Sequence, residues 1–297
     1  MVIMNKTKGI LLTIFSASSF GFIPLFAKIA YANGLNPYTL CLFRSLFASI
    51  GLFVLLKIKK IDYTIENALY VPLFKLSFIG FSLTILTLTL SYNHMSTGLA
   101  TTIHFIYPVA VMMGSVFFYH EKIEKIKIFS LILSLAGMYF LIGFNPLEST
   151  SIIGVLLALF SGFSYAYYII TIARGRIKEM NPFVLIFYVS LFTSYILFVI
   201  SIFMGKLEMS YTFKGIVSTV LVALVANLIG MVLFKAGVKI ISATTAAILS
   251  TFEPITSLIL GMLVFKEILS WYHIVGSMLI ISSVIIIAFK KKELKIL

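Results

Sequence analysis

The chain consists of long apolar runs separated by short polar segments. Each run has about 20 residues, the length that a helix needs to cross the hydrocarbon layer of a bilayer. Backbone groups in lipid must be hydrogen-bonded within their own segment, and the runs lack the alternation of barrel strands, so helices are expected. The pattern predicts an all-α polytopic membrane protein with ten transmembrane helices, over residues 9–31, 37–57, 69–92, 97–119, 127–145, 152–173, 182–204, 215–236, 242–265 and 271–289.

The composition agrees with this pattern and excludes two other classes of protein. Hydrophobic residues make up 61% of the 297 residues and charged residues 11%, whereas charged residues are about 25% of a soluble domain. A disordered chain needs few apolar residues and high charge. The first run is too long for a signal-peptide core, which is about 7–15 residues, so we expect it to be the first span.

The net charge is +13, and the positions of the basic residues predict the orientation. Ten spans place both termini on one side of the membrane. The opposite side carries four basic residues, Lys28, Lys206, Lys214 and Lys266. The side of the termini carries sixteen, which are Lys6, Lys8, Lys57, Lys59, Lys60, Lys122, Lys125, Lys127, Arg174, Arg176, Lys178, Lys239, Lys290, Lys291, Lys292 and Lys295. The positive-inside rule therefore predicts cytoplasmic termini.

The two halves of the chain resemble each other at a nearly constant offset. At an offset of 145, Asn36-Pro37 matches Asn181-Pro182, and at 146, Pro108 and Glu121 match Pro254 and Glu267. Chance similarity between apolar runs is the alternative, but the constant offset favours two halves of five spans each. Because each half has an odd number of spans, the second half crosses the membrane with inverted topology. Inverted repeats recur in secondary transporters, whose substrate sites lie near the membrane midplane between the two halves.

Three short motifs give the chain a resemblance to a known family. They are Asn36-Pro37 followed by Arg44, Pro108 followed by Glu121, and Phe252-Glu253-Pro254 followed by Gly261 and Lys266-Glu267. With the ten-span frame, they resemble the drug/metabolite transporter superfamily, in its branch with paired EamA domains. The resemblance implies two EamA-like repeats, 9–143 and 154–288, in one integrated membrane domain. It also implies transport of small polar metabolites, often the export of amino acids.

One position departs from the family pattern. Phe20 precedes Gly21 in the first span, where many members of the family carry tryptophan. The substitution keeps an aromatic ring, and we expect it to alter the wall of any cavity there.

Glu253 is the most unusual polar residue within the spans. It lies in the middle of the ninth span, next to Pro254, where a charged side chain costs roughly 2.5–3.5 kcal/mol on insertion scales. A partner, a hydrated cavity or protonation must offset this cost. One interpretation is a proton-coupling or substrate-amine site. The other is a structural hydrogen bond to backbone freed by Pro254, or to another helix.

Arg44 is the second charge inside an apolar run, about a third of the way into the second span. Three roles are open for it. It could bind a substrate carboxylate, brace helices by donating to carbonyl groups, or extend toward the outer surface. A pair with Glu253 is a further alternative.

Several uncharged or titrating side chains complete the candidate site. The spacing of Thr101, His104 and Pro108 predicts one shared helix face; His104 is either a proton relay or a neutral histidine bonded to a neighbouring helix. The hydrogen-bonding candidates are Tyr107, Asn227, Ser19, Tyr165 and Tyr168, with helix packing as the alternative role. Pro24, Pro108 and Pro254 lie inside spans and are expected to kink helices or act as hinges.

These features favour a secondary transporter of small polar metabolites that works by alternating access, above all an exporter of amino acids or related metabolites. An importer or exchanger of another metabolite, such as a nucleotide or cofactor-like compound, is the alternative. An intramembrane enzyme is a remote one. The sequence contains no catalytic or phosphate-binding motif. We therefore expect no enzymatic activity, no cofactor and no metal. The energy is expected to come from a gradient, for which proton coupling is one route, or from a partner that this chain does not encode.

The expected partners are a small-molecule substrate and membrane lipid, without nucleic acid or an obligate protein partner. The basic tail is expected to face anionic lipid headgroups. Lysine outnumbers arginine 20 to 3, as in AT-rich genomes, which favours a bacterial source and the cytoplasmic (inner) membrane.

Overall fold

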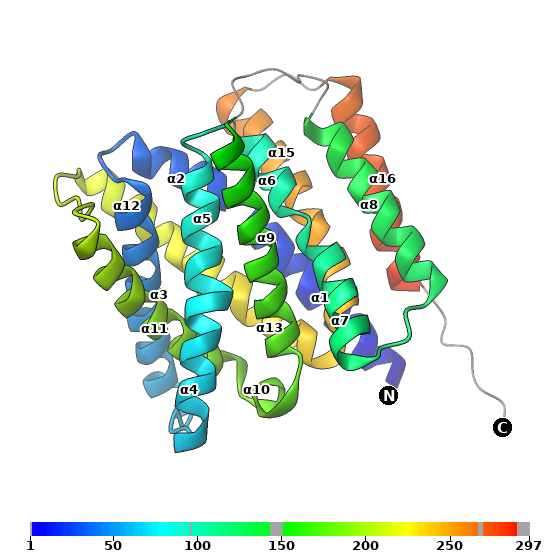
Figure 1. The fold of residues 1–297 in the computed structure, drawn as a ribbon, viewed down its shortest axis with the longest axis horizontal. Helices are drawn as coiled ribbons and strands as arrows, with labels where there is room; N and C mark the ends of the chain where they lie inside the picture. Colours follow the sequence, from blue (N-terminus) through cyan, green and yellow to red (C-terminus); the bar gives the residue numbers. More distant parts are fainter. Residues whose placement is uncertain (1, 96, 143–150, 267–269, 290–297) are drawn as a thin grey trace.

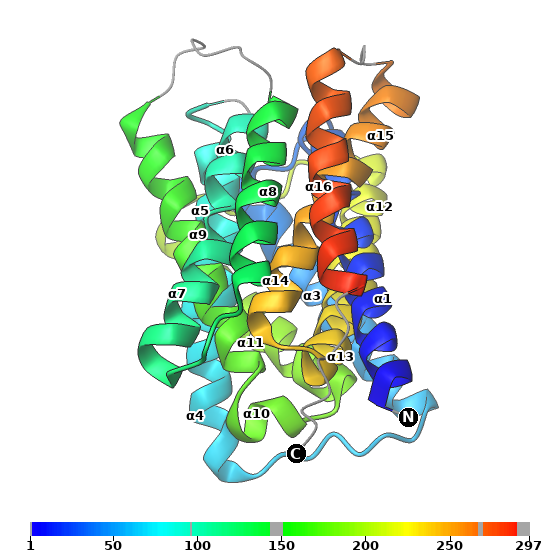
Figure 2. The same cartoon turned by 90° about the vertical axis from the view of Figure 1, so that its right-hand side faces the viewer.

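The computed structural model describes residues 2–95, 97–142, 151–266 and 270–289. Glu267 and the lysines of the tail lie outside the described residues. The described elements are all helical and form one bundle (Figures 1 and 2). They are α1 (Val2–Phe20), α2 (Ile23–Tyr31), α3 (Pro37–Ile58), α4 (Asn67–Lys75), η1 (Leu76–Ser82), α5 (Leu83–Ser91), α6 (Thr97–His104), α7 (Tyr107–Tyr119), α8 (Lys125–Ile142), α9 (Ile152–Ile172), α10 (Gly175–Glu179), α11 (Pro182–Phe203), α12 (Phe213–Val222), η2 (Ala223–Met231), α13 (Val232–Ile240), α14 (Ala243–Leu249), η3 (Ser250–Phe252), α15 (Glu253–Phe265) and α16 (Trp271–Phe289).

The helices account for the spans expected from the sequence. Within the described ranges, nine helices are long and apolar enough to cross a membrane. The remaining predicted span corresponds to α8, which lies alongside α16 in Figure 2. The prediction of an all-helical, multi-spanning membrane fold is therefore confirmed.

Three of the predicted spans are divided into shorter segments. The first consists of α1 and α2, the fourth of α6 and α7, and the ninth of α14, the 3₁₀ turn η3 and α15. Pro24, Pro108 and Pro254 are each the second residue of the segment that follows the break. Proline suits this position, because the N–H that it lacks has no intrahelical partner there and its fixed φ is helical. Each proline therefore begins a new segment rather than bending a continuous helix.

The third and eighth spans contain π-helical segments at corresponding places, η1 and η2. Glycines in both segments allow neighbouring helices to approach closely. A Cβ atom on Gly80 would lie 3.0 Å from Cβ of Tyr168, and one on Gly230 would lie 2.7 Å from Cε1 of Phe20. Such π-helical turns are rare and are frequent at functional sites.

Helix contacts interlock the two halves. The most extensive contacts join α8 with α16, α11 with α3, α1 with α13 and α5 with α9. In span numbers these pairs are 5 with 10, 7 with 2, 1 with 8 and 3 with 6. When each span is replaced by its counterpart in the other half, the pairs 5–10 and 2–7 are unchanged. The pair 1–8 becomes the pair 3–6. The contacts therefore follow a two-fold pattern.

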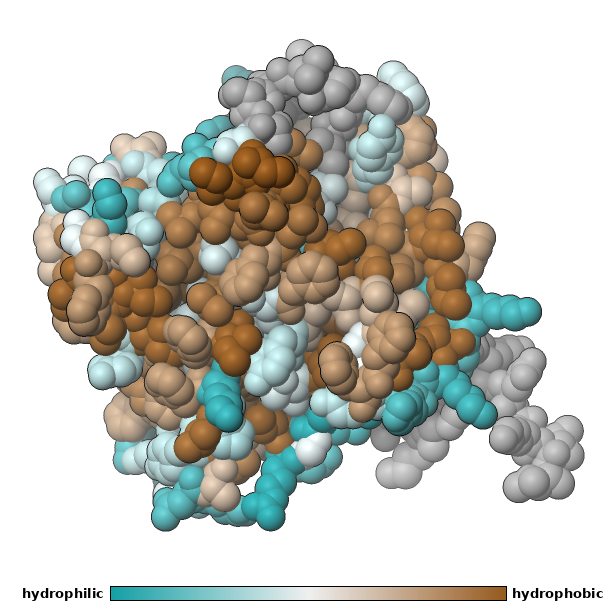
Figure 3. All heavy atoms as spheres, viewed as in Figure 1, coloured by the Kyte–Doolittle hydropathy of each residue, from teal (hydrophilic) through white to brown (hydrophobic). Residues whose placement is uncertain are grey.

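The start of α1 and the end of α16 lie at the same end of the bundle, here called the terminus end (Figures 1 and 2). The start of α4, the short α10 and the end of α7 lie there too. Figure 3 shows hydrophilic residues along this edge, below a broad hydrophobic surface. Large apolar side chains such as Phe117, Phe203 and Leu263 are exposed on the bundle, as expected for helices that face lipid.

The contact between α8 and α16 depends on two glycines. A Cβ atom on Gly137 would lie 2.7 Å from the carbonyl oxygen of Gly276, and one on Gly276 would lie 2.6 Å from the carbonyl oxygen of Gly137. Real Cβ atoms do not approach backbone this closely. The two helices therefore pack with their backbones almost in contact, as small residues permit in membranes.

We expect Gly137→Ala to lower the thermal unfolding temperature of the detergent-purified protein, because the new methyl group must push α16 away. Overpacking of this kind costs about 1–3 kcal/mol. Gly51→Ala is the matched control, since its Cβ would meet only Cδ1 of Leu228, at 3.4 Å. Alanine favours helix at both positions, so equal unfolding temperatures for the two variants would contradict the proposed contact.

Candidate functional site

A cavity of about 490 Å³ lies between the two halves. The elements around it are α2, the end of α5, α6, the end of α8, α15 and the start of α16. These segments lie away from the terminus end in Figures 1 and 2, so the cavity extends from the middle of the bundle toward the opposite end. It is lined by Gly21, Pro24, Leu25, Ala27, Lys28, Tyr31, Tyr92, Thr101, Thr102, Phe105, Met138, Leu141, Glu253, Pro254, Ser257, Leu258, Leu260, Gly261 and His273.

Glu253 lies at the mid-bundle end of this cavity, as the first residue of α15. No side chain among the described residues donates a hydrogen bond to its carboxyl group, which faces the cavity. The hydroxyl groups of Tyr92, Tyr107 and Tyr165 lie within electrostatic range of it. The geometry therefore gives no support to the structural hydrogen bond considered for Glu253.

Gly21 brings Glu253 to the first span. It lies in the break between α1 and α2, and a Cβ atom there would lie 2.8 Å from the carbonyl oxygen of Glu253 and 2.6 Å from Cβ of Thr256. Any larger residue would displace α15. Gly21 thus fixes the position of Glu253 at the floor of the cavity.

Rings of α6, α7, α9 and α13 form an aromatic cluster next to the cavity residue Phe105, whose ring centroid lies 5.4 Å from that of Tyr107. The cluster consists of His104, Tyr107, Tyr165, Tyr168 and Phe234. The centroids of Tyr107 and Tyr165 are 4.8 Å apart at an angle of 81°, and the centroid of His104 lies 5.3 Å from Tyr107 and 5.6 Å from Tyr165. Tyr165 also stacks on Tyr168 at 5.8 Å and on Phe234 at 6.4 Å. These rings pack against one another inside the bundle, where Tyr107, Tyr168 and Phe234 are fully buried.

Polar contacts join the helices at the terminus end. Arg174, after α9, pairs with Glu121, after α7, and its guanidinium lies 4.4 Å from the ring centroid of Tyr119. Lys127 of α8 donates to Oγ of Ser242, before α14, at 3.2 Å. These contacts link helices of both halves at the terminus end.

Lys235 of α13 holds the α9–α10 corner in place. Its side chain is fully buried, and Nζ donates to the carbonyl oxygens of Ile172, Ile177 and Lys178 at 2.8, 2.7 and 2.9 Å. All three donors of the ammonium group are therefore used. Nothing in the sequence pattern singled out this lysine.

The EamA-like transporter family matches residues 7–143 and, a second time, residues 152–289. The chain belongs to the EamA-like transporter family. This membership agrees with the resemblance to the drug/metabolite transporter superfamily found in the sequence. It makes the chain a transporter and a multi-pass membrane protein.

Bacterial relatives bear names that agree with the family. An uncharacterized transporter of Clostridium kluyveri is 24% identical to this chain. The match covers 89% of this chain and 88% of the Clostridium protein. The uncharacterized transporter YwfM of Bacillus subtilis is 28% identical over 55% of each chain. A solved crystal structure, 14% identical in sequence, has a TM-score of 0.81 and covers 94% of this chain and 95% of its own; it supports the fold alone.

In this EamA-family chain, three of the site residues expected from the sequence line the cavity, namely Glu253, Pro24 and Pro254. His104 does not share a continuous helix with Pro108, because α6 ends at His104. Its Nδ1 lies 2.8 Å from Oγ of Ser161 on α9, which is the neighbouring-helix bond considered for it. Ser19 donates to the carbonyl oxygen of Phe15 in its own helix at 2.9 Å.

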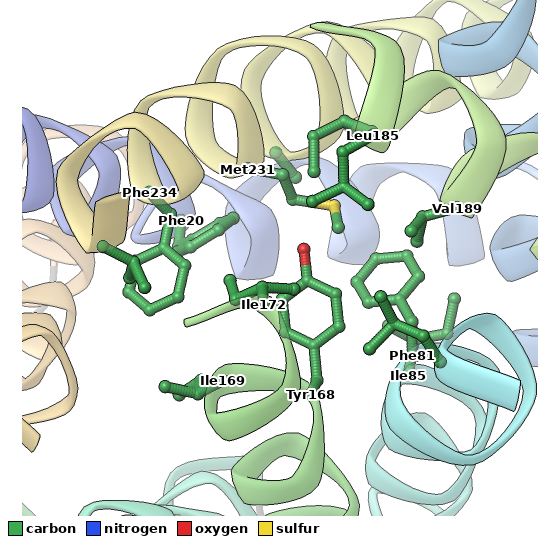
Figure 4. Close-up of a cluster of buried hydrophobic side chains, with 14 of the residues drawn as sticks. Phe20, Phe81, Ile85, Tyr168, Ile169, Ile172, Leu185, Val189, Met231 and Phe234 are labelled. Carbon is green, nitrogen blue, oxygen red and sulfur yellow. The ribbon is translucent and has the colours of Figure 1, made fainter. Parts of the chain in front are cut away.

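Tyr168 lies in the hydrophobic core rather than on the cavity. Figure 4 shows its hydroxyl group pointing among Leu185, Met231 and Ile172, and no described residue hydrogen-bonds to it. Asn227, in η2, is also fully buried, and neither its side-chain nitrogen nor its oxygen has a partner among the described residues. The spacing of these residues was compatible with a cavity wall, but helix packing turns them elsewhere.

The cavity wall also contains residues that the sequence did not single out. Tyr31 and Tyr92 end the first and third spans. Tyrosines at span ends are ordinary interfacial anchors, so the residue type alone did not indicate a place in a cavity wall. Ser257 follows Glu253 by four residues and therefore shares its helix face; that spacing could have identified it. Within the described part of the chain, no three His, Cys, Asp or Glu side chains gather as metal ligands.

Proposed function

We propose that this transporter exports an amino acid or a related small polar metabolite across the cytoplasmic membrane by alternating access. The observation that carries the proposal is the one-sided cavity. It contains Glu253 at mid-bundle depth and extends away from the terminus end, while the Glu121–Arg174 pair and the Lys127–Ser242 bond link helices at the terminus end. This is the arrangement expected of a transporter with its site facing one side.

The size and chemistry of the cavity suit a small polar metabolite. A volume of about 490 Å³ falls within the range of about 300–1,000 Å³ typical of small-molecule sites. Apolar and aromatic residues such as Phe105, Met138 and Leu258 cover much of its wall. Glu253, Lys28 and a few hydroxyl groups provide separate acidic, basic and neutral polar contacts.

The alternate state requires changes at both ends of the bundle. The terminus end opens when the Glu121–Arg174 pair and the Lys127–Ser242 bond break and the rings of the aromatic cluster separate. The Glu121 and Arg174 side chains are 26% and 32% exposed, so partial hydration keeps the cost of breaking this pair small. Protonation and deprotonation of Glu253 at the cavity floor would couple the change to a proton gradient.

The proposed orientation has the terminus end in the cytoplasm. The sequence predicts a set of lysines and arginines for the cytoplasmic side. Those that the structure describes lie in elements and loops of the terminus end, such as α10 and the segment after α3. Flanking lysines and arginines are retained on the cytoplasmic side during insertion. The cavity then faces outward, as in the state from which an exporter releases its substrate.

Flux measurements in proteoliposomes test the proposal. We expect saturable uptake of at least one labelled amino acid or related metabolite, accelerated when unlabelled substrate is present on the opposite side of the membrane. Protein-free liposomes prepared from the same lipids are the control. If a broad panel of amino acids, nucleotides and amphipathic drugs gives no saturable flux, the proposed function is wrong.

A further inference from the structure

Arg44 is a buried cation that has no partner within the described residues. It is 7% exposed, its Nε has no hydrogen-bond partner, and it forms neither an ion pair with Glu253 nor a hydrogen bond to a described carbonyl group. Its Cζ lies 6.0 Å from the ring centroid of Phe81. A buried charge without an anion is costly, so a brace between helices does not account for this geometry.

A second unpartnered group lies beside it. The hydroxyl of Tyr31 is buried and has no hydrogen-bond partner within the described residues, although the residue itself lines the cavity. Tyr31 and Tyr92 are both within electrostatic range of Arg44, and both belong to the cavity wall. Arg44 is not itself a lining residue, but its buried guanidinium lies within electrostatic range of the two tyrosines that form this part of the wall.

The donors of this pair match one class of ligand group. A guanidinium presents parallel N–H groups that fit the two oxygens of a carboxylate, and a phenol adds a third donor. Lys28 adds positive charge to the same wall. Glu253 is the one acidic residue among the residues that line the cavity, and it lies at the floor. Among the described residues Arg44 and Glu253 form no ion pair, and Tyr92 lies within electrostatic range of both.

We propose that Arg44 and the Tyr31 hydroxyl form a carboxylate subsite, which a substrate carboxylate occupies by inserting between Tyr31 and Tyr92. The ammonium group of the same substrate faces Glu253, so the site selects zwitterions. This inference rests on the proposed function and assigns each end of the substrate to its own residues.

Ligand-dependent thermal unfolding of the detergent-purified protein tests the subsite. The probes are the twenty proteinogenic amino acids and, for each one that stabilises the protein, its carboxamide and its decarboxylated amine. We expect at least one amino acid to stabilise the protein and its carboxamide and amine to lose the effect. Loss of a charge-assisted bidentate contact should weaken binding at least about tenfold in Arg44→Gln, with a smaller loss in Tyr31→Phe.

Control variants separate binding from folding. Arg176→Gln removes an exposed arginine that pairs with Glu66 far from the cavity, and it should bind like the wild type. Arg44→Lys keeps the charge without the bidentate geometry and should bind more weakly than the wild type but better than Arg44→Gln. If Arg44→Gln does not fold, Tyr31→Phe decides the question, because it removes one hydroxyl group only.

Three results would overturn the inference. The first is equal stabilisation by acid and carboxamide, and the second is no stabilisation by any amino acid. The third is unchanged binding in Arg44→Gln or, if that variant does not fold, in Tyr31→Phe. If proteoliposomes nevertheless transport a substrate that lacks a carboxylate, the proposed transport function stands and the carboxylate subsite alone is rejected.

Discussion

Glu253→Gln should reduce substrate accumulation driven by a pH gradient to the level of empty liposomes, while exchange of labelled for unlabelled substrate continues. A carboxyl group at the cavity floor can gain and lose a proton, whereas an amide of nearly the same shape cannot. Exchange requires substrate binding but no net movement of protons. Glutamine preserves the volume of the side chain, and its carbonyl oxygen still accepts a hydrogen bond from an ammonium group, so exchange should continue, at a higher substrate concentration than in the wild type. Both activities can be measured in one proteoliposome preparation by imposing or omitting the pH gradient.

Glu66→Gln is the matched control for this experiment. Glu66 is an exposed residue that pairs with Arg176 outside the cavity, so its amide variant should retain both activities. Equal loss of accumulation and exchange in Glu253→Gln would contradict proton carriage. It would instead limit Glu253 to substrate binding or to folding.

Lys235→Met should cause the largest loss of stability among the substitutions considered for this chain. Methionine fills a similar volume but leaves the carbonyl groups of Ile172, Ile177 and Lys178 without their donor. A buried polar group left unpaired costs about 1–3 kcal/mol, so we expect a loss of about 3 kcal/mol or more. The thermal unfolding temperature in detergent, compared with that of the wild type, measures this effect.

Lys239→Met provides the comparison one helical turn away. Lys239 donates to the carbonyl oxygen of Glu179 at 2.8 Å and pairs with its carboxylate at 3.4 Å, but its side chain is 37% exposed. Water replaces the lost contacts there, so only a small decrease is expected. If both variants unfold at the same temperature, the three carbonyl bonds of Lys235 do not stabilise the α9–α10 corner.

The spans could be predicted because membrane insertion depends on a property that the sequence states directly, the length of each apolar run. Glu253 could be identified for a related reason, since a carboxylate inside such a run is rare and costly. The prolines marked the places where spans divide. They did not predict whether the helix bends or a new segment begins there, because proline occurs both at kinks and at helix starts. The π-helical form of η1 and η2 left no comparable signal in residue type.

The rest of the site depends on contacts between residues far apart in the chain. Tyr165 and Tyr168 have the same types and spacing as cavity-lining tyrosines, yet helix packing directs their rings into the aromatic cluster. Lys235 looked like an ordinary lysine near a span end until its three carbonyl partners, more than 50 residues away, were in place. Arg44 became informative when its lack of a partner was known, which is a property of the folded chain only.

The paired π-helical segments have a consequence for motion. A π-helical turn holds an additional residue, and converting it to an α-helical turn rotates everything beyond it by one residue, about 100°. Because η1 and η2 occupy corresponding spans, each half contains one helix that can turn about its own axis while its hydrogen bonds are exchanged rather than lost. Asn227 lies within η2, and a rotation of this kind would carry its unpartnered amide from one set of neighbours to another.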